Sequence, residues 1–305
     1  MQIPLTPLRA FDLTARHQSV SRAAEQLDVT QPAVTQQIRR LERAVGLRLF
    51  RREGRRIVPT EAGETLGAFA QRIFQLLDAA GDALEGVAGL ATGHLAVGAS
   101  RTAGSYYVAG LLDRFKRRYP GIRVSLAVAN SQIILARVSD FTLHAGVVAG
   151  RPADPNVIAR PLVRDRLLAI LPPGHPLRRR SALTVYDLRG LPLVLREPGS
   201  TTRRLIEEAF AARGLTITAA MELEDNEAIK SAVADGVGVA MMAHAAVAGD
   251  LAAGRLLGRP LRGAPVLEFV LTYHRDRVLS PVLAAFLALL PRRRILGAAA
   301  RTGGL

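Results

Sequence analysis

Residues 20–45 read VSRAAEQLDVTQPAVTQQIRRLERAV, and this stretch decides the fold of the N-terminal part of the chain. Its apolar residues Val34, Ile38, Leu41 and Val45 recur at spacings of four, three and four. That spacing predicts a helix with one apolar stripe, which must pack against neighbouring elements.

The ends of this helix are also marked in the sequence. Thr30 is a suitable N-cap, and Pro32 falls in the first turn, where a missing backbone N–H costs little. A shorter helix is expected over residues 20–27, with a break at residues 28–30. Two short helices joined by such a tight turn form a helix-turn-helix.

The outer face of the second helix carries amide and guanidinium groups. Gln36 and Arg39 lie opposite the apolar stripe, and Gln31 and Thr35 flank it. Glutamine can pair with adenine edges, and arginine with guanine edges or phosphates, so this face suits the major groove of DNA. On this stretch alone, a small helical hairpin with a solvated basic face remains an alternative.

The charge distribution supports a polyanionic partner at this end of the chain. The chain has 305 residues and a net charge of +15. Residues 1–60 contain eleven Arg and five Asp or Glu, which is +6 of that total. We interpret the Arg clusters at 178–180 and 292–294 as solvated surface rather than as a second nucleic-acid site.

Several classes of protein are disfavoured by what the sequence lacks. There is no cysteine, so disulfides, thiolate metal sites and a cysteine nucleophile are excluded. Metal-binding spacings of His and acidic residues, G-x-S-x-G and Walker-type loops are also absent. We therefore expect neither an enzyme nor a resident cofactor. With no signal segment and no membrane-length apolar run, we expect a cytoplasmic protein without a membrane partner.

The ten residues after the second helix predict a basic hairpin. Residues 51–60 read RREGRRIVPT, in which Arg51, Arg52 and Arg55 surround a glycine that can turn the chain. Residues 57–58 can pair back as a short strand. Such a wing can rest on the phosphate backbone beside the helix. The alternative is an exposed basic loop.

A long linker helix is expected over residues 61–89. Apolar residues follow one another there in steps of three and four, at Ala62, Leu66, Phe69, Ile73, Leu76, Ala80, Ala83 and Val87. This pattern predicts a coiled-coil seam that pairs with a second copy of the chain. The helix contains several glycines, which weaken an isolated helix, so burial of the seam must compensate. Packing on its own domain is the alternative.

The first ninety residues resemble the LysR-type transcriptional regulators. The resemblance is carried by AAEQL, TQPAVTQQIRRLE, GLRLFRR and PTEAG. It implies a winged helix-turn-helix DNA-binding domain at residues 1–60 and a dimerising linker helix at 61–89. By position, the implied DNA contacts are Thr30, Gln31, Pro32, Thr35, Gln36, Arg39, Arg51, Arg52 and Arg55.

Residues 93–295 alternate between strand and helix patterns, which predicts an α/β fold with parallel sheet. A first set of strands, a second set and a return to the first indicate two lobes joined by two crossing strands. We expect lobe I at 93–163 and 267–295, and lobe II at 164–266. In the family that this chain resembles, the effector-binding body is similar to periplasmic solute-binding proteins.

Three expected strands end in small hydroxyl residues, where open α/β folds bind ligands and helix N-termini favour anions. The candidate effector-binding residues are Ser100, Arg101, Thr102, Ser131, Ser200, Thr201 and Thr202. Residues 197–203, EPGSTTR, resemble a signature found among regulators of sulfur, nitrogen and carbon assimilation. We expect a small anionic co-inducer between the lobes. Helix capping by the same residues is the alternative.

The resemblance also implies partners, and the sequence departs from the family pattern at one position. Family members usually form a dimer of dimers on a pseudo-palindromic double-stranded DNA operator, and RNA polymerase is a candidate partner. His144 stands where the family commonly has an acidic residue, so it is either a satisfied structural residue or a change in effector chemistry. A DNA-tethered enzyme and a ligand-independent DNA-bending protein are the other functions to weigh.

Overall fold

The structure is a computed structural model that describes residues 2–54, 56–87, 92–290 and 295–296. Its contacts divide the chain into two compact units, residues 1–81 and 82–305, and each is described by itself. The last two residues of the predicted linker helix, 88 and 89, lie outside the described residues.

The first unit is a three-helix bundle with a β-hairpin and the start of a long helix. Its elements are α1 (Leu5–His17), α2 (Val20–Leu27), α3 (Gln31–Val45), β1 (Phe50–Glu53), β2 (Arg56–Pro59) and α4 (Glu61–Val87), the last of which continues past the end of the unit. Leu8, Phe11, Leu41, Leu49 and Phe74 are buried together in its core. The predicted helix-turn-helix and hairpin are therefore confirmed as structural elements.

The predicted seam of α4 divides between two environments, and its pairing with a second copy stays a prediction. Ala62, Leu66 and Ile73 are partly buried against the core of their own unit. Phe69 and Leu76, by contrast, are 60% and 57% exposed. The apolar face of α4 is wider than a single seam, so one side of it contacts α1 and the loop before β1 while the other side stays open.

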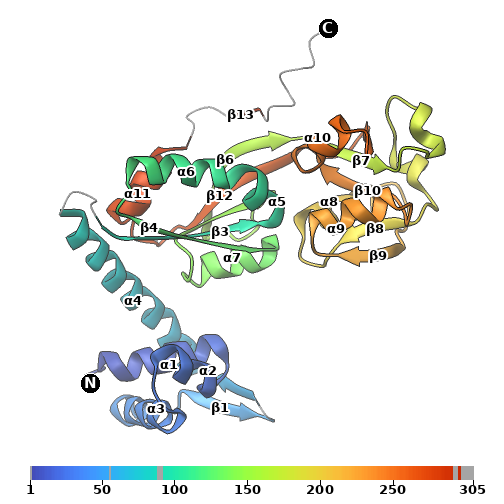
Figure 1. Ribbon diagram of the computed structural model, residues 1–305. Coiled ribbons are helices and arrows are strands. Elements are labelled where there is room, and N and C mark those ends of the chain that lie inside the picture. Colours follow the sequence, from blue (N-terminus) through green and yellow to red (C-terminus); the bar gives the residue numbers. More distant parts are fainter. Residues whose placement is uncertain (1, 55, 88–91, 291–294, 297–305) are drawn as a thin grey trace. The chain divides into compact units, whose positions relative to one another are not determined.

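Lobe I of the second unit is a six-stranded sheet covered by helices on both faces (Figure 1). Its elements are β3 (His94–Ser100), α5 (Arg101–Ala103), the π-helical η1 (Gly104–Val108), α6 (Ala109–Arg118), β4 (Arg123–Ala129), α7 (Ser131–Ser139), β5 (Ala145–Ala149), β6 (Val157–Asp165), β12 (Leu267–His274), α11 (Pro281–Ala288) and β13 (Ile295–Leu296). Apolar side chains of α6 and α11 bury one face of the sheet, and those of α7 bury the other.

The sheet of lobe I is mixed rather than parallel. Strands β4, β3 and β5 are parallel, as predicted, but β12 runs antiparallel to both β5 and β6. The reason is the path of the chain: β12 returns from lobe II and enters the sheet from the opposite end. Hydrophobic patterning gives the position of a strand but not its direction.

Lobe II has a three-stranded antiparallel sheet, β10-β7-β11, and a parallel pair, β8-β9. A bridge between Leu193 and Val239 connects the two. The elements are β7 (Leu167–Leu171), η2 (Pro176–Arg179), η3 (Val185–Leu188), β8 (Leu193–Arg196), α8 (Thr201–Ala211), β9 (Ala219–Leu223), α9 (Asn226–Ala234), β10 (Ala240–Ala243), α10 (His244–Ala252) and β11 (Leu257–Pro260). The sequence did not predict α10 or β11.

The chain crosses between the lobes twice, from β6 to β7 and from β11 to β12. Asp165, buried at the first crossing, accepts hydrogen bonds from the Tyr107 hydroxyl (2.6 Å) and the Ala245 N–H (3.0 Å). These bonds join lobe I to lobe II beside the crossing, which confirms the two-lobed α/β architecture. Within the described residues, none of the helices has the length and apolar character needed to cross a bilayer.

Candidate functional site

Helix α3 presents its polar face to solvent because its apolar stripe is fully used in the core. Val34, Ile38 and Leu41 are buried, and the Thr30 hydroxyl caps the helix by accepting the Ala33 N–H at 3.4 Å. The cap fixes where the helix starts, and with it the direction of every outer side chain.

The predicted DNA-contact residues of α3 come together on one shallow surface. Gln31, Pro32, Gln36 and Arg39 are exposed and Thr35 is half-buried. Together with Arg43, these five residues line a shallow hollow of about 580 Å³. Arg43 lies outside the predicted set, although its place on the outer face could have indicated it.

The basic hairpin has the expected form. β1 and β2 pair antiparallel with Arg51 opposite Val58 and Arg52 opposite Ile57, and Gly54 adopts a left-handed turn conformation. Arg52 is exposed, whereas Arg51 forms an ion pair with Glu53 on the same strand. Arg55, the third predicted wing residue, lies outside the described residues.

The seven predicted effector residues meet in the second unit. Ser100 ends β3 and Arg101 and Thr102 follow it, Ser131 follows β4, and residues 200–202 follow β8. All of them line one very small cavity of about 10 Å³, with Asn130, Ala149, Arg196 and Phe269. The carboxyl ends of three strands thus converge on one point from both lobes, as the fold rule for ligand sites requires.

A second, larger hollow adjoins this cavity. Its volume is about 740 Å³, and it shares Ser131, Ala149, Ser200 and Thr201 with the small cavity. Its outer part carries three arginines, Arg151, Arg203 and Arg204. The outer hollow can hold a small metabolite, whereas the inner cavity barely reaches the volume of one water molecule.

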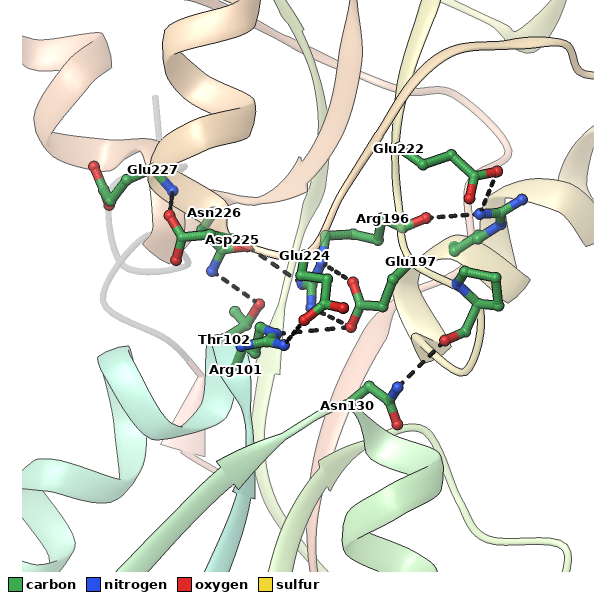
Figure 2. Close-up of polar contacts among 12 residues, drawn as sticks. Arg101, Thr102, Asn130, Arg196, Glu197, Glu222, Glu224, Asp225, Asn226 and Glu227 are labelled. Carbon is green, nitrogen blue, oxygen red and sulfur yellow. Dashed lines mark hydrogen bonds and ion pairs between the residues drawn. The ribbon is translucent and has the colours of Figure 1, made fainter.

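Direct contacts between the lobes close the inner cavity (Figure 2). Arg101 forms ion pairs with Glu224 and, at 3.8 Å from its Nε, with Glu197. The Asn226 amide donates to the Thr102 hydroxyl at 3.4 Å.

On the other side of the cavity, the Asn130 amide donates to the Pro198 carbonyl at 3.3 Å, and the Gln132 N–H donates to the Gly199 carbonyl at 3.3 Å. A molecule larger than water therefore enters the inner cavity only when some of these inter-lobe contacts open.

The charged centre of the site is a buried pair that the sequence did not predict. Arg196 donates two hydrogen bonds to the Glu197 carboxylate, at 2.8 and 3.0 Å, and a third to Asn226 at 3.3 Å. Both charged side chains are buried. Glu197 opens the EPGSTTR stretch, which was the available signal, but nothing local indicates that Arg196 turns inward.

Two buried polar atoms of cavity-lining residues, the Ser100 Oγ and the Arg101 Nε, have no hydrogen-bond partner among the described residues. The Arg101 Nε faces the Glu197 carboxylate at 3.8 Å. A buried hydroxyl without a partner is costly, and ligand sites are where such groups are found. This hydroxyl lies next to Arg101 in the chain and lines the same cavity.

His144 is a satisfied structural residue and lines neither hollow. Its ring Nδ1 accepts a hydrogen bond from the Ala96 N–H at 3.3 Å, and its backbone N–H donates to the Ala96 carbonyl at 2.8 Å. Burial, together with the positive charge of Arg277 and the neighbouring His94, lowers the pKa of His144 to about 3. Of the two interpretations of His144, its hydrogen bonds and its place outside both hollows favour the structural one.

Family models match almost the whole chain. Residues 5–64 match the lysR-family bacterial regulatory helix-turn-helix protein, and residues 88–294 match the LysR substrate binding domain. The chain belongs to the LysR family. This LysR-type transcriptional regulator is 34% identical over 302 residues to the RuBisCO operon transcriptional regulator of Allochromatium vinosum, covering 99% of this chain and 98% of that protein.

Two solved structures are similar in fold to this chain. Full-length OxyR from Pseudomonas aeruginosa matches with a TM-score of 0.74 at 22% identity, covering 97% of this chain and 100% of that one. The CcmR regulatory domain of Synechocystis, solved in complex with 2-PG, matches with a TM-score of 0.61 at 26% identity, covering 67% of this chain and all of that one. The predicted fold class and regulator function are thus confirmed.

Proposed function

We propose that two copies of this LysR-type regulator pair through α4 and place two α3 helices on a pseudo-palindromic operator. The exposed apolar residues Phe69, Leu76, Leu77 and Leu84 support this pairing, since they recur along one side of α4 and are 47–74% exposed among the described residues. We also propose that the protein forms a dimer of dimers, acts in the cytoplasm and contacts RNA polymerase. The proposed domain limits are 1–60, 61–89 and 93–295.

The DNA contacts are proposed to come from Thr30, Gln31, Pro32, Thr35, Gln36 and Arg39 on and before α3, with Arg51, Arg52 and Arg55 of the wing on the backbone. Replacing Arg39 with Ala should weaken operator binding by about 1–3 kcal/mol and relax one position of the operator if Arg39 reads a base. Fluorescence anisotropy against single-base operator variants measures both effects. Unchanged affinity and preference would remove Arg39 from the contact set.

The effector is proposed to be a small anion bound between the lobes. The observation that carries this is the meeting of the seven hydroxyl- and guanidinium-bearing residues around one cavity that contains the unpartnered Ser100 hydroxyl. The CcmR regulatory domain, which has a similar fold, was solved in complex with 2-PG, and this supports a small-molecule ligand for the domain. No turnover of the bound molecule is expected, because the sequence has no cysteine, no G-x-S-x-G or Walker-type motif and no metal-binding spacing of His and acidic residues.

A thermal-shift screen tests the effector proposal. Inorganic phosphate, sulfate, small carboxylates and 2-PG are added to the full chain, and a specific ligand raises its melting temperature. Thr102→Ala and Thr201→Ala should lose this response while DNA binding is retained. Loss of basal DNA binding in these variants would mean that the two threonines serve folding instead.

The target genes are proposed from the relatives alone. The regulator of Allochromatium vinosum that spans the full chain acts on a RuBisCO operon. This supports an operator next to genes of carbon assimilation. Sequencing of genomic fragments captured by the full chain tests it, and enrichment of promoters unrelated to carbon assimilation would contradict it.

A further inference from the structure

We propose that Glu224 acts as an internal competitor of the effector for Arg101, and so sets how tightly an anion is bound. The inference rests on the effector site proposed above. It gives a role in that site to Glu224, which lines neither the inner cavity nor the outer hollow. Arg101 is the first residue of α5, and its Nη2 pairs with Glu224 across the gap between the lobes (Figure 2).

The two carboxylates near Arg101 differ in how firmly they are held. Glu197 is buried and both of its oxygens accept hydrogen bonds from Arg196, at 2.8 and 3.0 Å. It faces the Arg101 Nε only at 3.8 Å. Glu224 is the closer partner of Arg101, yet its side chain is 68% exposed. Within the described residues, Arg101 is the one cation that pairs with Glu224.

The charges around the cavity are balanced while Glu224 stays in place. Arg101 and Arg196 carry two positive charges, and Glu197 and Glu224 carry two negative ones. If Glu224 moves away, one positive charge at Arg101 is left over, beside the unpartnered Ser100 hydroxyl. A guanidinium and a hydroxyl donor side by side suit the oxygens of a carboxylate, sulfate or phosphate.

Glu224 can leave at small cost, whereas Glu197 cannot. An exposed carboxylate regains its hydration when it turns to solvent, and exposed ion pairs contribute little to stability. Removing Glu197 would instead leave the buried Arg196 guanidinium without compensation, which is strongly destabilising. The carboxylate that an anionic effector replaces is therefore the one contributed by Glu224.

Calorimetric titration of the full chain tests this competition. 2-PG is the probe, with inorganic sulfate as a second probe, and Glu224→Gln is compared with the natural protein. The variant keeps the size of the side chain but removes its charge, so the dissociation constant should fall by about two- to fivefold, the range expected for an exposed ion pair.

Asp113→Asn is the matched control. Asp113 is also an exposed carboxylate in an ion pair, and its partner Arg117 lines neither the inner cavity nor the outer hollow. Its replacement should leave the dissociation constant within experimental error. An equal gain in both variants would show a general effect of negative charge, and it would overturn the specific role of Glu224.

A double-mutant cycle shows whether Glu224 acts through Arg101. Arg101→Gln should weaken binding, and adding Glu224→Gln to it should give no further change. A full gain from Glu224→Gln in the absence of Arg101 would overturn the inference.

The remaining outcomes separate the two proposals. If the natural protein binds a probe and Glu224→Gln binds it equally well, only the competition is wrong. If neither protein binds either probe, the anion site fails and the competition fails with it. Binding by Glu224→Gln alone would be the strongest support for the competition.

Discussion

His144 departs from the family pattern and has a structural role in this chain. Its ring and its backbone N–H are both hydrogen-bonded to Ala96, and its pKa is lowered to about 3 mainly by burial. The folded protein therefore keeps this histidine neutral throughout the physiological range. The free energy of unfolding falls only in acid, because there the histidine is protonated in the unfolded chain but stays neutral in the folded chain.

Replacing His144 with Gln should make stability less sensitive to acid. An unfolded histidine titrates near pH 6.5, so this group stabilises the fold fully above that pH. Its contribution is lost by up to about 1.4 kcal/mol per pH unit as the pH falls from 6.5 toward 3. Urea unfolding between pH 7.5 and 4.5 measures the difference. Parallel losses in both proteins would contradict the assignment.

Gly199 holds the lobes close through its backbone. Its φ is +85°, and a Cβ there would lie 2.8 Å from the Gln132 Oε1. Gly199→Ala should cost about 1–2 kcal/mol from the left-handed backbone and should also loosen the Gln132 N–H to Gly199 carbonyl bond. Hydrogen exchange at the Gln132 amide measures the loosening.

Gly190→Ala is the control for Gly199→Ala, because Gly190 has a φ of +75° and no atom within 4 Å of the added Cβ. It should show the backbone cost without faster exchange at Gln132. Equal exchange rates in the two variants would mean that crowding between the lobes is not what the substitution at Gly199 disturbs.

Single residues of the inter-lobe site could be predicted only where a local rule applies. Ser100, Ser131 and Thr201 stand where strands give way to helices, and the sequence shows this. Arg196 and Asn226 are buried hydrogen-bond partners from distant segments, so no local sequence pattern predicts their contact. Glu224 was missed for the same reason, since its partner Arg101 is far away in the chain.

At the scale of elements, α4 contacts its own unit on one side and is open on the other. Ala70 and Phe74 are buried in the first unit, while Phe69 and Leu76 are exposed. Heptad spacing predicted one continuous seam, because spacing measures only which residues share a face. How much of that face the rest of the unit covers depends on tertiary packing, which the sequence pattern does not contain.

The closest contact of α4 predicts a sharp contrast between two of its glycines. A Cβ on Gly63 would lie 2.1 Å from the Leu49 carbonyl oxygen, whereas one on Gly67 would meet nothing within 4 Å. Gly63→Ala should destabilise the first unit by about 1–3 kcal/mol. Gly67→Ala should gain up to about 1 kcal/mol from helix propensity. Thermal unfolding followed by circular dichroism checks both, and equal effects would contradict the packing described.

The return strand β12 marks the limit of pattern-based topology. Lobe I was predicted to resume at residue 267, where β12 begins, but the antiparallel direction of β12 follows from where lobe II ends. The short α10 is rich in alanine, and β11 includes a proline and an arginine, so neither has the apolar alternation that identifies buried elements. Patterning therefore gave the lobes and not the full sheet order.

At the scale of the whole molecule, pairing through α4 should fail when its open stripe is charged. Phe69→Glu and Leu76→Glu each place a carboxylate where two apolar faces would meet, so sedimentation velocity should show a shift toward lone subunits. Val266→Glu is the control, because Val266 is similarly exposed, at 63%, in the second unit. An unchanged assembly in the α4 variants would locate the pairing elsewhere.

The central claim is that paired copies read a specific duplex sequence, and anisotropy titration of the full chain tests it most directly. A duplex selected by the protein is compared with a scrambled duplex of equal length at the same salt concentration. We expect the selected duplex to contain two inverted half-sites and to bind about 10³-fold more tightly or better. Phe69→Glu should lose most of this advantage. Equal affinity of the natural protein for both duplexes would contradict the account.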